Sequence, residues 1–152
     1  MNSAAAARSK TTSSLLKNAS KITRRVAFHE TDAMGVVHHA NFLRYFEEAR
    51  VVWLEEHDEP YTAYMDRDLH FATTRVEIDY HKSAHFDERI EVETWLEKLR
   101  GASLRMAYRI TRGDEVLVSG VTEHAAVDTE GRLRRIPKDR RANMKTKLKP
   151  ES

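Results

Sequence analysis

A carboxylate placed just before a helix is the feature of this sequence best suited to chemistry. Asp32 lies in a predicted loop beside Gly35, and a strongly patterned helix is expected to start at about His39. The first N–H groups of a helix have no acceptor within the helix, and they carry the positive end of its dipole. Such groups can hold a developing oxyanion while a nearby carboxylate attacks or activates water. This arrangement is one way to build an acyl-transfer site.

Asp32 also has a simpler interpretation. A loop aspartate commonly serves as a turn residue that accepts local backbone hydrogen bonds, and the spacing alone favours that role. If the carboxylate is catalytic, the helix dipole should keep it ionised, so that it acts as a base or a nucleophile rather than as an acid. The residues do not distinguish these two roles. A serine nucleophile is disfavoured, because Ser83, Ser103 and Ser119 lack the context of a nucleophile elbow.

The helix that would hold this loop is amphipathic. Apolar residues recur at the spacing of one helical face: Phe42, Phe46, Ala49 and Trp53. Charged residues fall largely on the opposite face, so one face should be buried and the other solvated. Pro60 requires that the helix has ended before it.

The rest of the chain has the alternation of β-strands. Four runs lack helical periodicity: residues 69–82, 86–98, 102–112 and 115–128. Gly101 and Gly113 mark turns between them, and residues 22–29 suit a first, edge-type strand. One helix and five strands predict an α+β domain, in which the apolar helix face packs on one face of the sheet.

The segment TDAMGVVHHANFLRYFEEAR at residues 31–50 resembles the defining segment of the hotdog-fold acyl-CoA thioesterases. The similarity extends over residues 22–137 and is strongest to the branch of 4-hydroxybenzoyl-CoA thioesterase and the Tol-Pal-associated thioesterases. It implies a curved, antiparallel, five-stranded sheet wrapped around one long helix. It also implies hydrolysis of a fatty or aromatic acyl-CoA to the free acid and coenzyme A, with no cofactor.

The resemblance assigns roles to five residues. Asp32 matches the catalytic aspartate of the family, and with this match we favour catalysis over the turn role. His39 matches a position that carries a catalytic His in one branch and a Tyr in another, and whose backbone N–H starts the helix. Arg100, Arg132 and Arg134 match arginines that contact coenzyme A.

Other functions remain open at this point. Phe42 stands where the family usually has Tyr, and His38 where another aromatic residue is common, so the acyl group is not specified. A non-catalytic module that binds acyl-CoA is the main alternative. An interaction protein that uses its basic ends, or a hotdog dehydratase, are further alternatives.

Composition and charge exclude several other classes. The 152 residues suit a single domain, and the absence of Cys excludes disulfides and thiolate metal sites. Residues 30–131 hold eleven Lys and Arg against twenty-two Asp and Glu, an acidic balance that does not suit nucleic-acid binding. No apolar run is long enough for a membrane span. We expect a cytoplasmic homodimer or homotetramer, because the long strands leave edges that a second copy would cover.

The two ends of the chain are basic. Residues 1–20 are expected to be a disordered extension, with an organelle transit peptide as the alternative, and residues 21–137 to be the thioesterase domain. Residues 138–152 form a basic tail, which either is frayed or complements the phosphates of coenzyme A. The eight His residues do not predict a metal site, because adjacent His38 and His39 diverge on a helix and no ligand spacing occurs.

Overall fold

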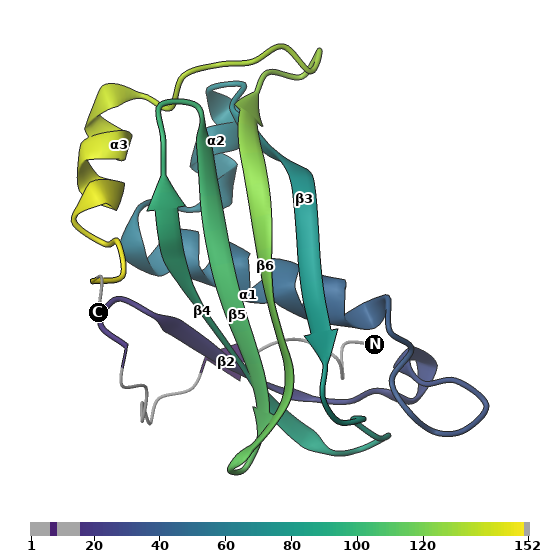
Figure 1. Ribbon diagram of the computed structural model, residues 1–152. Coiled ribbons are helices and arrows are strands. Elements are labelled where there is room, and N and C mark those ends of the chain that lie inside the picture. The colour runs from purple at the N-terminus through teal and green to yellow at the C-terminus, as the bar shows by residue number, and fades with distance from the viewer. Residues whose placement is uncertain (1–6, 9–15, 151–152) are drawn as a thin grey trace.

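The computed structural model describes residues 7–8 and 16–150. One antiparallel sheet has the strand order β1-β2-β4-β5-β6-β3. The strands are β1 (Ala7–Arg8), β2 (Ser20–Arg25), β3 (His70–Tyr80), β4 (Arg89–Leu99), β5 (Ser103–Arg112) and β6 (Glu115–Val127). The helices are α1 (Asn41–His57), α2 (Tyr61–Asp66) and α3 (Lys138–Lys145), with a 3-10 turn at Phe28–Glu30. The long strands curve around α1 (Figure 1).

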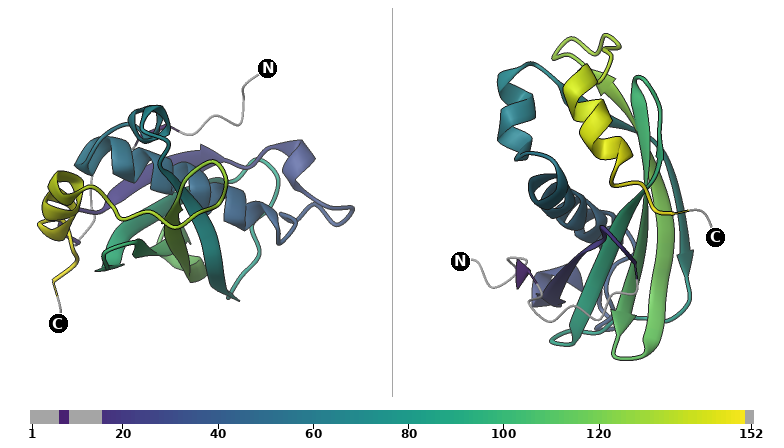
Figure 2. Two further views of the ribbon diagram at one scale, coloured as in Figure 1. Left: turned by 90° about the horizontal axis from the view of Figure 1, so that it is seen from above. Right: turned by 90° about the vertical axis from the view of Figure 1, so that its left-hand side faces the viewer.

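Helix α1 lies against the concave face of the sheet because its apolar stripe is buried there (Figure 2). The ring of Phe46 stacks on that of Tyr108 with a centroid separation of 4.1 Å. Gly120 on β6 makes this close approach feasible. A Cβ at that position would lie 2.7 Å from the Glu77 carbonyl oxygen and 3.0 Å from the Phe46 ring. Helix and sheet therefore form one core, as the periodicity predicted.

Strand β3 forms one edge of the sheet and is open to solvent on both faces. It pairs with β6 from His70 opposite Val127 to Tyr80 opposite Val118, and the described residues provide no partner on its other side. Residues 72–77 are exposed. The first and last of its eleven residues are separated by ten steps of about 3.3 Å each, so this strand is about 33 Å long. Groups at its two ends are therefore far apart.

The structure confirms the α+β arrangement, the long helix and the four later strands, whose ends shift by a few residues. The first strand is shorter than predicted: it ends at Arg25, and residues 28–30 form the 3-10 turn. The Glu30 side chain causes the chain to turn here, because its carboxylate accepts the Ala27 N–H (2.8 Å). The predicted connection 61–68 contains the short helix α2.

Helix α3 was not predicted by either interpretation of the basic C-terminal segment. Met144 is fully buried, and the Asn143 amide donates to the His57 carbonyl oxygen (2.9 Å) and to Asp58 (2.7 Å). Arg140 pairs with Asp58 (3.2 Å). The interpretation as a frayed tail is therefore wrong for residues 138–145. One apolar anchor among many charges gives too weak a pattern to predict such a helix.

The predicted disordered extension, residues 1–20, lies largely outside the described residues, since 1–6 and 9–15 are not described. Its last residues belong to the folded domain. The Trp53 indole donates to the Asn18 carbonyl oxygen (2.8 Å), and Ser20 is buried in β2 and donates to Glu56 (2.6 Å). Among the described residues, no helix is long and apolar enough to cross a membrane.

Candidate active site

The loop that carries Asp32 is a closed hairpin before the N-terminal end of α1. Thr31 and Val37 form a bridge across it, so the loop ends are held together. At its tip Gly35 has φ +78°, a left-handed backbone that favours glycine. The Val37 N–H also donates to the Ala84 carbonyl oxygen (2.8 Å), which ties the hairpin to the segment after β3. The loop is thus supported from two sides.

The Asp32 carboxylate is exposed at the top of this hairpin. Its Oδ1 atom accepts the Met34 N–H (2.8 Å), which is the local hydrogen bond of a turn residue. Its other oxygen accepts no hydrogen bond from the part of the chain that the structure describes. One oxygen is therefore fixed by the loop and the other is open to a ligand or to water. Both predicted roles of Asp32, turn residue and reacting group, are compatible with this geometry.

His39 presents a free backbone donor two residues before the regular helix. Helix α1 begins at Asn41, two residues later than predicted, and the Asn41 N–H donates to the His38 carbonyl oxygen (2.9 Å). The Ala40 N–H donates to Nδ1 of His38 (3.2 Å), so the His38 side chain caps the helix start. Within residues 7–8 and 16–150, the His39 N–H has no hydrogen-bond acceptor. It is available to an oxyanion, as the resemblance implies.

A hollow of about 270 Å³ opens beside His39. It is lined by Val37, His39, Phe42, Tyr80, His81, Lys82 and Ser83. The Tyr80 hydroxyl donates to the His39 carbonyl oxygen (3.2 Å), and its ring contacts Phe42 with a centroid separation of 5.7 Å. Sequence reasoning did not select Tyr80 as a site residue. The alternation of Val76, Ile78 and Tyr80 was the available signal, because it placed Tyr80 on the helix-facing side at the end of β3.

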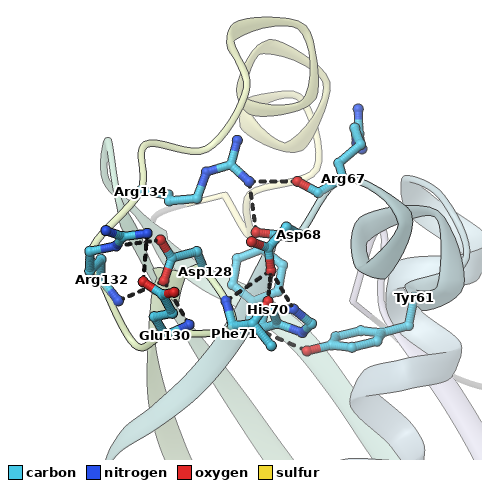
Figure 3. Close-up of polar contacts among 10 residues, drawn as sticks. Tyr61, Arg67, Asp68, His70, Phe71, Asp128, Glu130, Arg132 and Arg134 are labelled. Carbon is cyan, nitrogen blue, oxygen red and sulfur yellow. Dashed lines mark hydrogen bonds and ion pairs between the residues drawn. The ribbon is translucent and has the colours of Figure 1, made fainter.

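Two of the predicted coenzyme A arginines lie in the segment that follows β6. Arg132 pairs with Asp128 (3.0 Å) and with Glu130 (2.7 Å). Arg134 donates from Nη1 to the carbonyl oxygens of residues 67–68, at 2.6 and 2.7 Å. Figure 3 shows that Arg134 thereby ties this segment to the chain just before β3. Carboxylates neutralise Arg132, whereas Arg134 is bonded to carbonyl oxygens and pairs with no carboxylate of the described residues.

The third predicted arginine, Arg100, lies at the turn between β4 and β5. It lines a hollow of about 200 Å³ together with Thr74, Lys98, Ser103, Leu104, Arg105 and Glu123. Arg105 is neutralised there by Glu97 (2.8 Å) and Glu123 (3.2 Å). No carboxylate of the described residues pairs with Arg100 or Lys98. This turn therefore carries two uncompensated positive charges beside a hollow.

The structure does not bring the three arginines to Asp32 within one chain. His39 contacts Tyr80 at the C-terminal end of β3, whereas Arg134 is bonded just before its N-terminal end. The strand between these points is about 33 Å long. The sequence-predicted residues therefore form two groups, Asp32 with His39 at one end of the sheet and the arginines at the other.

The histidines do not gather around a common centre. Among residues 7–8 and 16–150, no group of three or more His, Asp or Glu side chains could hold a metal ion. His124 is fully buried and has hydroxyl partners, Thr122 at Nε2 (2.6 Å) and Thr73 at Nδ1 (3.3 Å). Burial, followed by the nearby charge of Arg50, lowers the pKa of His124 to about 3, so this residue is a neutral part of the core.

Comparison with known proteins identifies the family. The sequence pattern of the thioesterase-like superfamily matches residues 26–149. The chain belongs to the thioesterase-like superfamily. One relative is the acyl-CoA thioesterase YbgC of Haemophilus influenzae, which is 32% identical over 115 residues, 75% of this chain and 85% of that protein. The acyl-CoA thioester hydrolase YbgC of Escherichia coli O6:H1 is 32% identical over 95 residues, 62% of this chain and 71% of that protein.

A solved structure supports the assignment of the fold. A hypothetical protein of Thermus thermophilus is 33% identical and superposes with a TM-score of 0.80, over 85% of this chain and 97% of that chain. The thioesterase-like superfamily and the YbgC relatives confirm the predicted family and branch. They also confirm the hotdog fold, in which five long strands, here β2 to β6, wrap around one central helix.

Proposed function

We propose that this protein hydrolyses acyl-CoA thioesters to a free acid and coenzyme A. The single observation that carries the proposal is the loop before α1, where an exposed carboxylate with one open oxygen precedes a free backbone N–H at the helix start. The names of the YbgC relatives support the same reaction. The hollow beside His39 offers space for the reacting group.

The reaction would begin with attack on the thioester carbonyl carbon. Either a carboxylate oxygen of Asp32 attacks directly, or Asp32 takes a proton from a water molecule whose oxygen attacks. The carbonyl oxygen then becomes an oxyanion, which the His39 N–H would stabilise together with the positive end of the α1 dipole. When the tetrahedral intermediate collapses, the carbon–sulfur bond breaks and the thiolate of coenzyme A leaves. In the water route this step yields the free acid directly. In the direct route it leaves an anhydride between the acyl group and Asp32, which a water molecule then hydrolyses to the free acid, restoring the carboxylate. In this proposal the His39 side chain would supply the proton that this thiolate takes up.

The position of the arginines requires a second chain in this proposal. Two β3 edges that pair antiparallel about a two-fold axis would place the His70 end of one strand beside the Tyr80 end of the other. The arginines of one chain would then lie near Asp32 of its partner. The open edge of β3, exposed on both faces, supports such pairing, because unpaired backbone groups of a long edge strand are usually covered.

The assembly is a prediction that light scattering can check. We expect a mass of at least two chains at all working concentrations, because β3 offers a long unpaired edge and the site is incomplete in one chain. A variant with Pro in place of Ile78, near the C-terminal end of β3, should shift the mass toward one chain, because proline disrupts strand pairing. A wild-type mass of about 17.6 kDa, that of one chain, would contradict the prediction.

The coenzyme A assignment predicts that Arg100→Ala raises the KM for an acyl-CoA about five- to thirtyfold with little change in kcat, because a charge-assisted contact to a phosphate is lost. The KM for an N-acetylcysteamine thioester should not change, because this substrate lacks the phosphates. Steady-state kinetics with both esters measures the difference. Arg134→Ala should act in the same direction, and Arg132→Ala more weakly, since Asp128 and Glu130 already neutralise Arg132. If the substitutions changed the KM for both esters equally, the arginines would not bind the phosphates of coenzyme A.

A second candidate function is a non-catalytic module that binds acyl-CoA. It is favoured by the Asp32–Met34 hydrogen bond, which a purely structural turn residue would also make. A thiol-release assay over a panel of aromatic, short-chain and long-chain acyl-CoAs decides between the two. Turnover supports the hydrolase and identifies the acyl group. Tight binding of the esters without release of thiol would support the module.

A further inference from the structure

A buried cluster of charges lies beneath the Asp32 loop and has no part in the steps proposed above. Glu30 is 3% exposed and Arg24 6% exposed. The two groups form a two-pronged pair, with Nη1 to Oε1 at 2.8 Å and Nη2 to Oε2 at 2.7 Å. The Tyr45 hydroxyl of α1 donates to the same Oε1 (3.0 Å). Burial of a carboxylate is costly unless it is paired and hydrogen-bonded, and Glu30 has these partners from β2 and α1.

The groups that surround Glu30 are themselves held by further contacts. Burial, and after it the charge of Glu30, raises the pKa of Tyr45, so its hydroxyl stays protonated and donates. Arg24 also lies over the Tyr45 ring, 4.5 Å from its centroid, and donates from Nε to Glu48 (2.7 Å). Glu30 is therefore held by groups that are themselves fixed, which makes its own position rigid.

The backbone of Glu30 holds both sides of the Asp32 loop. Its carbonyl oxygen accepts the His38 N–H (2.9 Å), and thereby fixes the end of the loop next to His39. The same oxygen accepts the Asn41 side-chain amide (2.8 Å), which fixes the first residue of α1. On the other side, Thr31 and Asp32 follow Glu30 directly in the chain. One immobilised residue thus connects the segment that carries the carboxylate to the segment that carries the free N–H.

We propose that Glu30 is a positioning residue, which sets the Asp32 carboxylate relative to the His39 N–H through its buried contact with Arg24. This inference rests on the proposed hydrolase function. Glu30 itself touches no substrate, because it is enclosed in the core. Its effect arises because a catalytic group displaced by about 1 Å can lose as much as about 10² in rate. Binding of coenzyme A depends on other residues and is unaffected.

Glu48 provides a matched control for the test. It bonds to the same Arg24, is also partly buried, and lies on α1 one turn from Tyr45. Its side-chain hydrogen bonds are to Arg24, and it makes no hydrogen bond to residues 31–39 in the described part of the chain, whereas Glu30 does. A substitution of Glu48 therefore disturbs the charge cluster without releasing the loop. Glu30→Gln and Glu48→Gln both remove one charge and keep the side-chain size.

The test compares the two variants at a temperature at which both are folded. Glu30→Gln should lower kcat roughly 10- to 100-fold and leave KM for the acyl-CoA within about twofold of wild type. Glu48→Gln should leave both parameters near wild type. A purely structural role of the cluster predicts similar effects of both variants, and that result would overturn the proposal. So would a wild-type kcat in folded Glu30→Gln.

A second readout does not depend on activity. Amide hydrogen exchange over residues 31–40 should accelerate in Glu30→Gln, most clearly at His38, and should match wild type in Glu48→Gln. If Glu30→Gln does not fold, Asn41→Ala can be tested in its place, because this substitution removes only the hydrogen bond from the Asn41 amide to the Glu30 carbonyl oxygen. We expect faster exchange and a lower kcat with unchanged KM in Asn41→Ala. Wild-type values of both would overturn the proposal, whereas a wild-type protein without thioesterase activity would contradict the proposed function itself.

Discussion

Asp32→Asn is expected to lower kcat for acyl-CoA hydrolysis at least about 10²-fold in a protein that remains folded. Asn keeps the oxygen that accepts the Met34 N–H, so the turn should persist. It removes the negative charge, however, and with it both the nucleophile and the base. The measurement is the steady-state release of thiol, accompanied by circular dichroism to confirm the fold.

The control for this variant is Asp114→Asn, which removes an exposed carboxylate at the turn between β5 and β6, next to Gly113. It changes the net charge of the protein by the same amount and should leave kcat unchanged. If Asp32 is only a turn residue, the two variants will behave alike. Near wild-type turnover by folded Asp32→Asn would therefore rule out both routes that we propose for attack on the thioester.

Mixed oligomers are expected to have a higher kcat/KM than either parent chain alone, if the site is shared between two chains. One parent is Asp32→Asn, which keeps its arginines. The other is Arg100→Ala with Arg134→Ala, which keeps its aspartate. In a heterodimer, Asp32 of the second chain meets the arginines of the first, so one of the two sites is intact. After random mixing of equal amounts, about one quarter of all sites should be native.

The measurement is kcat/KM before and after the two parents are unfolded together and refolded. We expect recovery to about a quarter of the wild-type value, well above either parent alone. In the control, each parent is refolded separately and the two folded proteins are then combined. The chains have already assembled with copies of themselves, so we expect no heterodimers in this mixture. A mixture whose kcat/KM equals the mean of its parents would show that the arginines do not act on the partner's site.

The proposal that two chains share the site follows from the position of strand β3 at the edge of the sheet. Among the described residues, no strand pairs with the outer side of β3, and residues 72–77 of this strand are exposed, so a second chain could pair with it. Carboxylates neutralise Arg132 and Arg105, whereas no carboxylate in the described part of the chain pairs with Arg100, Lys98 or Arg134 at the far end. These three side chains are therefore candidates to contact a polyanionic ligand.

The sequence by itself determined those secondary-structure elements that depend on residues close together in the chain. The stripe from Phe42 to Trp53 predicted helix α1, and period-two alternation predicted four strands, because burial of one face imposes each of these periods on neighbouring residues. The placement of Asp32 just before a helix start followed from the same helix. The segment 31–50 was long enough to identify the family, which the comparisons confirm.

Tertiary structure decided the features that depend on residues distant in sequence. Helix α3 exists because Met144 reaches the core and Asn143 meets the end of α1, contacts that its charged sequence does not reveal. The Glu30–Arg24 cluster was missed for the same reason: a carboxylate in a loop gives no sign that β2 and α1 will enclose it. The separation of the arginines from Asp32 was set by the length of β3 and its pairing with β6. Periodicity assigns a residue to a face, but only the register of paired strands fixes which ends of the sheet meet.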